Sequence, residues 1–167
     1  MTYHARLNWV MAITLFGVIV FLYVMPHSTE VQEYSISAMP SEAVQHIRIL
    51  TQHREVVLHR TEYGWFIVQP VSVAADENKV RKMLEILKAK SSHRFSRENL
   101  GDFGLNQPNL QLFLDDEHFS FGGFASTTLQ QYLATRDHVY LISPHYALAV
   151  PVDVQALINP AQAAVNR

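Results

Sequence analysis

Residues 76–90 read DENKVRKMLEILKAK, and this stretch predicts the main helix of the fold. Asp76 is a favourable N-cap because its carboxylate can accept hydrogen bonds from backbone N–H groups of the first turn. The apolar residues recur at intervals of three and four, which is the spacing of one helix face: Val80, Met83, Leu84 and Leu87. The sequence therefore predicts one amphipathic helix over 76–90 that packs against another layer.

Short runs rich in β-branched and aromatic residues on both sides of this helix predict strands. The runs are 46–51, 54–61 and 65–68 before the helix, and 110–114, 118–121, 129–136 and 138–142 after it. The run 65–68 is dense enough to be buried on both faces or to lie under a helix. Gly122-Gly123 is expected to end the run before it, and short helices are expected near Pro144 and over 152–158. The predicted fold class is α+β, a mostly antiparallel sheet domain packed with one main amphipathic helix.

An uncharged segment, WVMAITLFGVIVFLYVM, extends from Trp9 to Met25. As a helix, its 17 residues would extend about 26 Å, against a bilayer core of about 30 Å. Trp9 and Tyr23 stand where interfacial aromatic residues are common, and Gly17 offers a small surface for helix packing. We therefore expect an N-terminal transmembrane helix over 9–25, with these three residues as anchor positions.

Two other interpretations of this segment are open. A cleaved signal peptide also has a charged start and an apolar stretch, but residues 23–27 contain no small-residue cleavage site. A buried core helix is the other, although 17 uncharged residues exceed what a small core usually needs. Arg6 precedes the segment and Glu30 follows it, so the positive-inside rule places residues 1–8 in the cytoplasm.

These expectations divide the chain into five parts. Residues 1–8 form a cytoplasmic tail and 9–25 the transmembrane helix. Residues 26–44 form a stalk, 45–159 the exported α+β domain and 160–167 a C-terminal tail. The expected location is the bacterial inner membrane, with a single crossing and the C-terminal domain in the periplasm.

Composition excludes several classes of protein. The 13 basic and 15 acidic residues give a net charge of -2, whereas nucleic-acid binding needs a basic footprint, so no nucleic-acid partner is expected. The chain has no cysteine, which excludes disulfides, zinc–thiolate sites and a thiol nucleophile. No cofactor is expected.

Two stretches carry a resemblance to a known family. Trp65 is followed by Pro70, then by the helix, and then by the turn Phe103-Gly104-Leu105-Asn106-Gln107-Pro108. An apolar strand ending in glycine and a strand pair follow, at Phe119 to Gly123, Tyr132-Leu133 and Val139 to Ile142. This order resembles the bacterial domain-of-unknown-function family number 4340, over about residues 45–150. Phe103 and Asn106 stand where the family usually has Tyr and Asp.

The resemblance implies an envelope protein with one N-terminal anchor. Some members of the family lie beside or within auxiliary parts of gliding-type ABC transport systems. No catalytic or ligand residues are established for the family, so the resemblance assigns none to this chain.

The sequence contains only weak signals of catalysis or metal binding. The histidines from His46 onward form no close metal-binding pair, and dispersed ones would have to converge in space. Ser120 lies in a strand pattern, without the nucleophile elbow of a serine hydrolase. Asp115-Asp116-Glu117 is expected to be a hairpin turn rather than an acid–base pair. No catalytic and no metal-binding residue is therefore predicted.

Two features are candidates for partner contact. Lys82, Lys88 and Arg94 belong to a basic cluster that could attract an acidic partner, although a solvated helix face is the simpler interpretation. Gly122 and Gly123 mark a bulge or turn, and they would also allow the backbone of a partner to approach closely.

The expected function is that of a membrane-anchored periplasmic binding or scaffold module, an accessory subunit of an envelope, transport-type complex. Its expected partners are the lipid bilayer, through the N-terminal helix, and a membrane or periplasmic protein. The alternatives are an envelope enzyme acting on glycan or lipid, and a small-ligand or lipid-binding domain.

Overall fold

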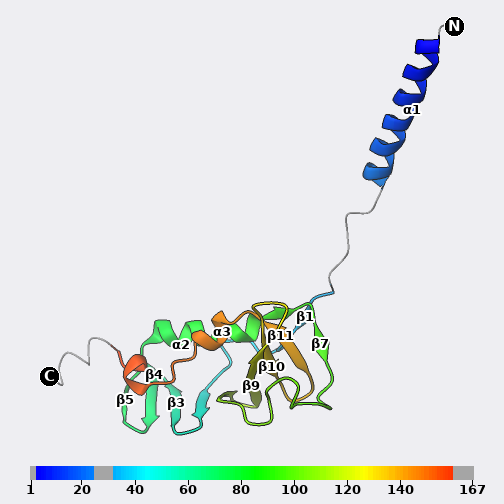
Figure 1. The fold of residues 1–167 in the computed structure, drawn as a ribbon. Coiled ribbons are helices and arrows are strands. Elements are labelled where there is room, and N and C mark those ends of the chain that lie inside the picture. Colours follow the sequence, from blue (N-terminus) through cyan, green and yellow to red (C-terminus); the bar gives the residue numbers. More distant parts are fainter. Residues whose placement is uncertain (1–2, 25–31, 160–167) are drawn as a thin grey trace. The chain divides into compact units, whose positions relative to one another are not determined.

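The computed structural model describes residues 3–24 and 32–159, and within the first range it describes the side chains of 8–21 and 23. The chain divides into two compact units, which meet in the sequence between Gln32 and Glu33 (Figure 1). The last residue of the predicted transmembrane helix, Met25, residues 26–31 of the predicted stalk and the predicted tail 160–167 lie outside the described residues.

The described residues of the first unit form one helix, α1 (Tyr3–Val24), apart from Gln32. Trp9 and Tyr23 are exposed near its two ends, and no atom lies within 4 Å of the position that a Cβ would take at Gly17. Over the residues that the structure describes, no helix is both long enough and apolar enough to cross a membrane.

The second unit is a sheet-rich α+β domain, and its described strand pairs are all antiparallel. Its strands are β1 (Tyr34–Ser35), β2 (His46–Thr51), β3 (Glu55–Thr61), β4 (Gly64–Gln69), β5 (Val73–Ala74), β6 (Lys90–Ser91), β7 (Arg94–Phe95), β8 (Leu110–Leu114), β9 (Glu117–Phe124), β10 (Gln131–Ala134) and β11 (Val139–Ile142). Its helices are α2 (Glu77–Leu84), the 3₁₀ helix η1 (Glu85–Lys88), α3 (His145–Leu148) and α4 (Val154–Leu157). Nine strands form one sheet in the order β5-β4-β3-β2-β8-β9-β10-β11-β7, and β1 pairs with β6.

The main helix is shorter than predicted. Asp76 is its N-cap, as expected, and accepts a hydrogen bond from the backbone N–H of Asn78 at 2.9 Å. The predicted helix over 76–90 is wrong at its end, because the α-helix stops at Leu84 and tightens into η1. Ile86 and Leu87 are buried in η1, and the helical path ends because the backbone is extended at Ala89 and Lys90 and Ser91 form β6.

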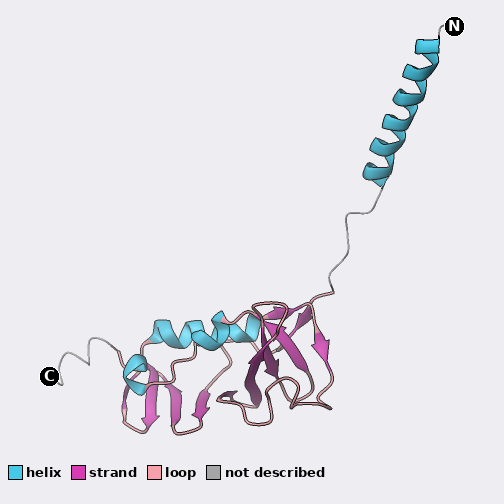
Figure 2. Cartoon of the chain, in the orientation of Figure 1, coloured by secondary structure: helices cyan, strands magenta, loops and turns pink. Residues whose placement is uncertain are grey.

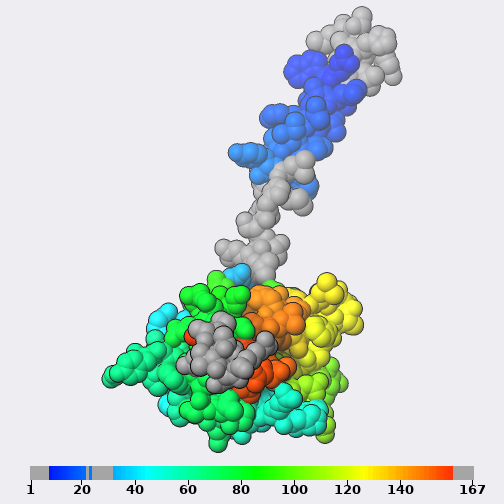
Figure 3. All heavy atoms as spheres, turned by 90° about the vertical axis from the view of Figure 1, so that its left-hand side faces the viewer, coloured from blue at the N-terminus to red at the C-terminus, as the bar shows by residue number. Residues whose placement is uncertain are grey.

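Helices and strands form two layers. Figure 2 shows α2 and α3 on one side of the strands. The main core lies between these layers and contains the four apolar residues of the predicted helix face, Val80, Met83, Leu84 and Leu87. Figure 3 shows the segment after β11, in orange to red, beside the green of α2, and the backbone N–H of Asp76 donates to the carbonyl of Leu157 at 2.7 Å.

Strand β4 lies under this helical layer, which is one of the two predicted arrangements. Trp65 and Ile67 are buried in the main core, whereas Phe66 is half-buried and Val68 exposed. Burial therefore alternates along the strand, as expected for a sheet covered mainly on one face.

A second, smaller core lies on the other face of the sheet. Leu133 belongs to the main core, while its neighbours on β10, Tyr132 and Ala134, belong to the smaller cluster. The segment from Phe95 to Leu105 covers this cluster. Strand β11 is buried along its whole length because it has a core on both faces.

The domain begins earlier than predicted. The sequence places its start at residue 45, whereas the compact unit begins at Glu33. Ile36 and Val44, from the predicted stalk 26–44, are buried in the main core, and β1 pairs with β6. A two-residue strand carries too little alternation to be recognised in a sequence.

Asp115 fixes the turn between β8 and β9. Its carboxylate accepts hydrogen bonds from the backbone N–H groups of Gln45 and His46, both at 2.9 Å, and Nδ1 of His46 lies 3.0 Å from Oδ1. Burial raises the pKa of Asp115, but these hydrogen bonds outweigh it and leave the pKa below its ordinary value of 3.8. The predicted hairpin turn is confirmed, and the carboxylate joins it to the start of β2.

Replacing this carboxylate should weaken the fold. We expect Asp115→Asn to lower the free energy of unfolding by about 1–3 kcal/mol at pH 7, since the backbone donors lose a charged acceptor. Because the folded pKa is lowered, the carboxylate stabilises the fold above pH 3.8, and this contribution disappears as the pH falls through the folded pKa. The variant and the parent should therefore converge in acid. Urea unfolding at neutral and acidic pH, with Asp116→Asn as the control, measures this; equal effects of the two variants would contradict it.

Candidate functional site

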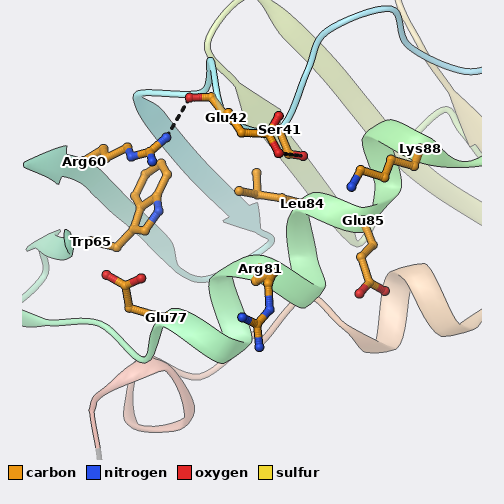
Figure 4. Close-up of a pocket in the computed structure, with 9 residues that line it drawn as sticks. All are labelled: Ser41, Glu42, Arg60, Trp65, Glu77, Arg81, Leu84, Glu85 and Lys88. Carbon is orange, nitrogen blue, oxygen red and sulfur yellow. Dashed lines mark hydrogen bonds between the residues drawn. The ribbon is translucent and has the colours of Figure 1, made fainter.

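A pocket of about 280 Å³ opens between the helical layer and strands β3 and β4 (Figure 4). It is lined by residues from the turn before β2, from the two strands and from the helices: Ser41, Glu42, Arg60, Trp65, Glu77, Arg81, Leu84, Glu85 and Lys88. We refer to this set as the charged pocket.

Local structure explains why these residues meet. Glu77, Arg81, Leu84 and Lys88 follow one another at intervals of four, three and four, so they form a stripe along one side of α2 and η1. Arg60 and Trp65 are directly opposite each other in the β3–β4 pair. The helix stripe and the strand pair thus form two walls of the pocket.

Charges of both signs line the pocket. Arg60 Nη1 donates to the backbone carbonyl of Glu42 at 2.7 Å, and Arg81 Nη2 donates to Asn78 Oδ1 at 2.6 Å. None of the ion pairs found among the described residues joins two lining residues. The three carboxylates and three cations are therefore available to a ligand or partner that carries complementary charges.

Trp65 forms an apolar part of the pocket. Its side chain is only 6% exposed, and Figure 4 shows Arg60 and Glu77 on either side of it. The Glu77 carboxylate also lies over Gly64, where a Cβ would meet Glu77 Oε1. An aromatic surface bordered by charges suits a polar or charged group with some apolar area, rather than an acyl chain.

The predicted basic cluster does not form one site. Lys88 lines the charged pocket, and no hydrogen bond or ion pair engages its ammonium group among the described residues. Lys82 is exposed on α2 and lines no pocket described here. Arg94 lies in β7, where its guanidinium carbon is 4.5 Å from the centre of the Tyr34 ring. Of these three residues, only Lys88 therefore lines the charged pocket.

Gly122 and Gly123 allow a close approach, but the approaching segment belongs to the same chain. The predicted break is wrong, since β9 continues through both residues to Phe124, and the register against β10 shifts there. The N–H of Gly123 donates to the carbonyl of Phe103 at 2.8 Å, and a Cβ on Gly122 would lie 2.4 Å from that oxygen. The register shift makes Gly122 and Gly123 a β-bulge, and the turn 103–108 packs against it.

The sequence does not reveal a contact between Ser120 and His118 in β9. Ser120 Oγ lies 3.0 Å from His118 Nε2, which is also 3.0 Å from Gln111 Oε1. Residues two apart on a strand share a face, and that spacing is the signal that could have indicated the contact. Among the described residues, no group of three histidine, aspartate or glutamate side chains could hold a metal ion.

Of the nine residues that line the charged pocket, only Lys88 was predicted as a contact. Glu42, Arg60 and Trp65 come from separate segments, and only the strand pairing and the helix packing bring them together. The sequence singled out Trp65 only as the start of the family motif. Its position beside α2 depends on tertiary structure.

Fold and pocket together define an α+β domain with a mostly antiparallel sheet and a charged surface pocket. The chain belongs to the family described as Domain of unknown function (DUF4340), whose model matches residues 65–165. This confirms the resemblance found in the sequence, although the match begins at Trp65 rather than near residue 45. No curated protein and no solved structure matches the chain.

Proposed function

We propose that the protein is a membrane-anchored binding module of the bacterial envelope, in which α1 lies in the inner membrane and the α+β domain contacts a partner in the periplasm. The partner is a membrane or periplasmic protein, and the chain serves as an accessory subunit of an envelope, transport-type complex. A tether of this kind confines the domain near the membrane, so that weak contacts with neighbours there suffice for binding.

The exposed apolar surface of α1 carries this proposal. The large apolar side chains described between Trp9 and Phe21 are 42–68% exposed. The uncharged run of the sequence extends from Trp9 to Met25 and includes positions whose side chains lie outside the described part. A helix that is apolar on all sides needs an apolar environment, and a bilayer provides one.

The charged pocket supports binding as the activity of the domain. Its unpaired charges would recognise complementary charges on a partner segment, and its aromatic wall would contribute apolar contact. Such contacts give orientation and specificity without any chemical step.

Reversing two cations of the pocket should weaken binding of the partner. We expect Arg81→Glu combined with Lys88→Glu to reduce recovery of co-extracted protein about tenfold or more, because it places like charges against the groups that the pocket recognises. The measurement is quantitative mass spectrometry after gentle detergent extraction of the full chain. The control is Arg54→Glu with Lys82→Glu, which makes the same change of charge outside the pocket. Equal losses in both variants would contradict a role for the pocket.

One observation favours an enzyme as the second candidate. The pocket brings together Ser41 and three carboxylates, groups that hydrolysis of glycan or lipid would use. Under that alternative, Glu77→Gln would abolish turnover of an envelope substrate and leave recovery of the partner unchanged. A small-ligand module is distinguished by a ligand that co-purifies with the parent and is lost from the Arg81→Glu, Lys88→Glu variant.

A further inference from the structure

Two histidines meet on the outer face of the sheet. His46 in β2 and His59 in β3 are directly opposite each other in the antiparallel pair. Their neighbours along the strands, Ile47 and Leu58, are buried in the main core, so both imidazoles lie on the face away from that core. Both side chains are exposed. The sequence alone shows no such pair, because strand pairing is what brings the two residues together.

The register of the two strands brings these side chains close together. The backbone N–H of Arg60 donates to the carbonyl of Gln45 at 2.9 Å, which makes Gln45 and Arg60 a hydrogen-bonded pair. Hydrogen-bonded and non-hydrogen-bonded pairs alternate along an antiparallel ladder, so the adjacent pair of His46 and His59 is of the second kind. Side chains of such pairs are closer to each other. The two ring centres are accordingly 4.6 Å apart, with an angle of 87° between the rings.

Asp115 orients one of the two imidazoles. Its Oδ1 lies 3.0 Å from Nδ1 of His46, and the backbone N–H groups of Gln45 and His46 hold the carboxylate in place. An ionised carboxylate only accepts hydrogen bonds, so Nδ1 carries the proton and Nε2 presents its lone pair. A carboxylate behind a histidine is the usual outer-shell partner of a metal-binding imidazole. Among the described residues, no hydrogen bond engages the ring nitrogens of His59.

The charges around the pair are compatible with a bound cation. Arg48, two residues along the same face, is paired with Glu55 at 3.5 Å. Arg60 lines the charged pocket on the other face, where it donates to the carbonyl of Glu42. The side chain of Asp115, 22% exposed, adds a negative charge directly behind His46.

We propose that His46 and His59 together bind a divalent transition-metal ion of the zinc type, with Asp115 as the outer-shell partner of His46. Imidazole nitrogens are good ligands for zinc and lie about 2.0–2.1 Å from it. Two nitrogens on one ion are therefore about 3 Å apart, a separation that ring centres 4.6 Å apart permit. The remaining positions of a tetrahedral ion are open to water or to a side chain of a partner protein, which agrees with the absence of a three-residue metal group among the described residues. The inference does not depend on where α1 lies.

Zinc titration of the full chain tests this site. The chain is purified in mild detergent without a polyhistidine tag, and binding is measured by isothermal titration calorimetry. We expect His46→Gln and His59→Gln each to weaken zinc binding about tenfold or more, at least as much as the loss of an outer-shell partner. The double variant should bind no more weakly than either single variant, because the two residues act on the same ion.

The chain contains nine histidines, so a matched control is needed. His53 is exposed in the turn between the same two strands, and His53→Gln should bind zinc like the parent. Zinc should raise the melting temperature of the parent and of His53→Gln but not that of His59→Gln. Since His59→Gln leaves the hydrogen bonds of Asp115 intact, this difference separates metal binding from stability of the fold.

The outer-shell role of Asp115 has its own test. Asp115→Asn should weaken zinc binding about tenfold, because a neutral amide is a weaker acceptor for the imidazole N–H. Asp116→Asn, which removes the neighbouring charge, should bind zinc like the parent.

Three results would overturn the metal site. The first is a parent chain whose melting temperature does not rise with excess zinc. The second is a His59→Gln variant that binds zinc as tightly as the parent. The third is an equal loss in the variants of His46, His53 and His59, which would assign the zinc to dispersed histidines.

Discussion

Replacing Gly122 by Ala is expected to lower the free energy of unfolding by about 2–3 kcal/mol, whereas the same change at Gly123 should alter it by less than about 1 kcal/mol. The two glycines are neighbours in β9, yet they face different surroundings. A Cβ at Gly122 would lie 2.4 Å from the carbonyl oxygen of Phe103 and 2.8 Å from Cγ of Leu105. At Gly123 the nearest atom, the same oxygen, would be 3.6 Å away, an ordinary contact.

The cost arises because backbone has to move. The carbonyl of Phe103 accepts the hydrogen bond from Gly123, and Leu105 is buried in the smaller core with Ala134 and Val139. An added methyl group would push the turn away from β9, break this hydrogen bond and expose part of that core.

Equilibrium unfolding in urea measures both variants, and Gly123→Ala is the matched control. Gly104→Ala should also be destabilising, by about 1–2 kcal/mol, because Gly104 has a φ of +66° and its Cβ would lie 2.9 Å from the backbone nitrogen of Gly123. Both changes separate the same two segments. The double variant should therefore lose less free energy of unfolding than the two single variants lose together. Equal stability of the Gly122 and Gly123 variants would contradict this account.

This contact explains why two distant stretches of the family motif occur together. The turn 103–108 and the strand ending in Gly122-Gly123 form one structural unit, in which a bulge receives a turn. The side chain of Gln131 supports it by donating from Nε2 to the carbonyl of Gly122 at 2.9 Å. These two stretches of the signature therefore record a packing requirement, whereas Trp65, at the start of the signature, lines the charged pocket.

The parts of the fold that were predictable are those with a local period. The spacing of Val80, Met83, Leu84 and Leu87 identified the buried helix face, and alternation identified the longer strands. By contrast, β1, β5, β6 and β7 have two residues each, and their formation depends on partners far away in the sequence. Local rules also misjudged Gly122-Gly123 as the end of a strand, because the partner that makes glycine necessary there is a remote turn.

The candidate site was predictable only in part, for the same reason. Lys88 was identified because basic residues gather in its segment. Arg60 and Glu42 belong to other segments, and sheet pairing and the turn before β2 bring them to the pocket. The pair of His46 and His59 likewise depends on the register of β2 against β3, which a single sequence does not fix.

Under the proposed anchoring by α1, placing two arginines in the middle of this helix should remove the protein from the membrane. Phe16 and Ile19 are 68% and 53% exposed and lie three residues apart, near the centre of the uncharged run. An arginine at the centre of a membrane helix costs about 2.5–3.5 kcal/mol. Phe16→Arg with Ile19→Arg should therefore cost about 5–7 kcal/mol, enough to lower membrane retention by more than a thousandfold.

The measurement is the fraction of full-length chain that stays in the membrane pellet after alkaline carbonate extraction. The control carries arginines at Thr127 and Thr128, which are exposed in the domain between β9 and β10, so its change in net charge is the same. A phosphatase that is active only outside the cytoplasm, fused after Arg167, should report activity for the parent and the control and lose it in the α1 variant. If the α1 variant stays in the pellet like the control, the exposed apolar surface of α1 is not what holds the protein, and the anchored module has to be abandoned.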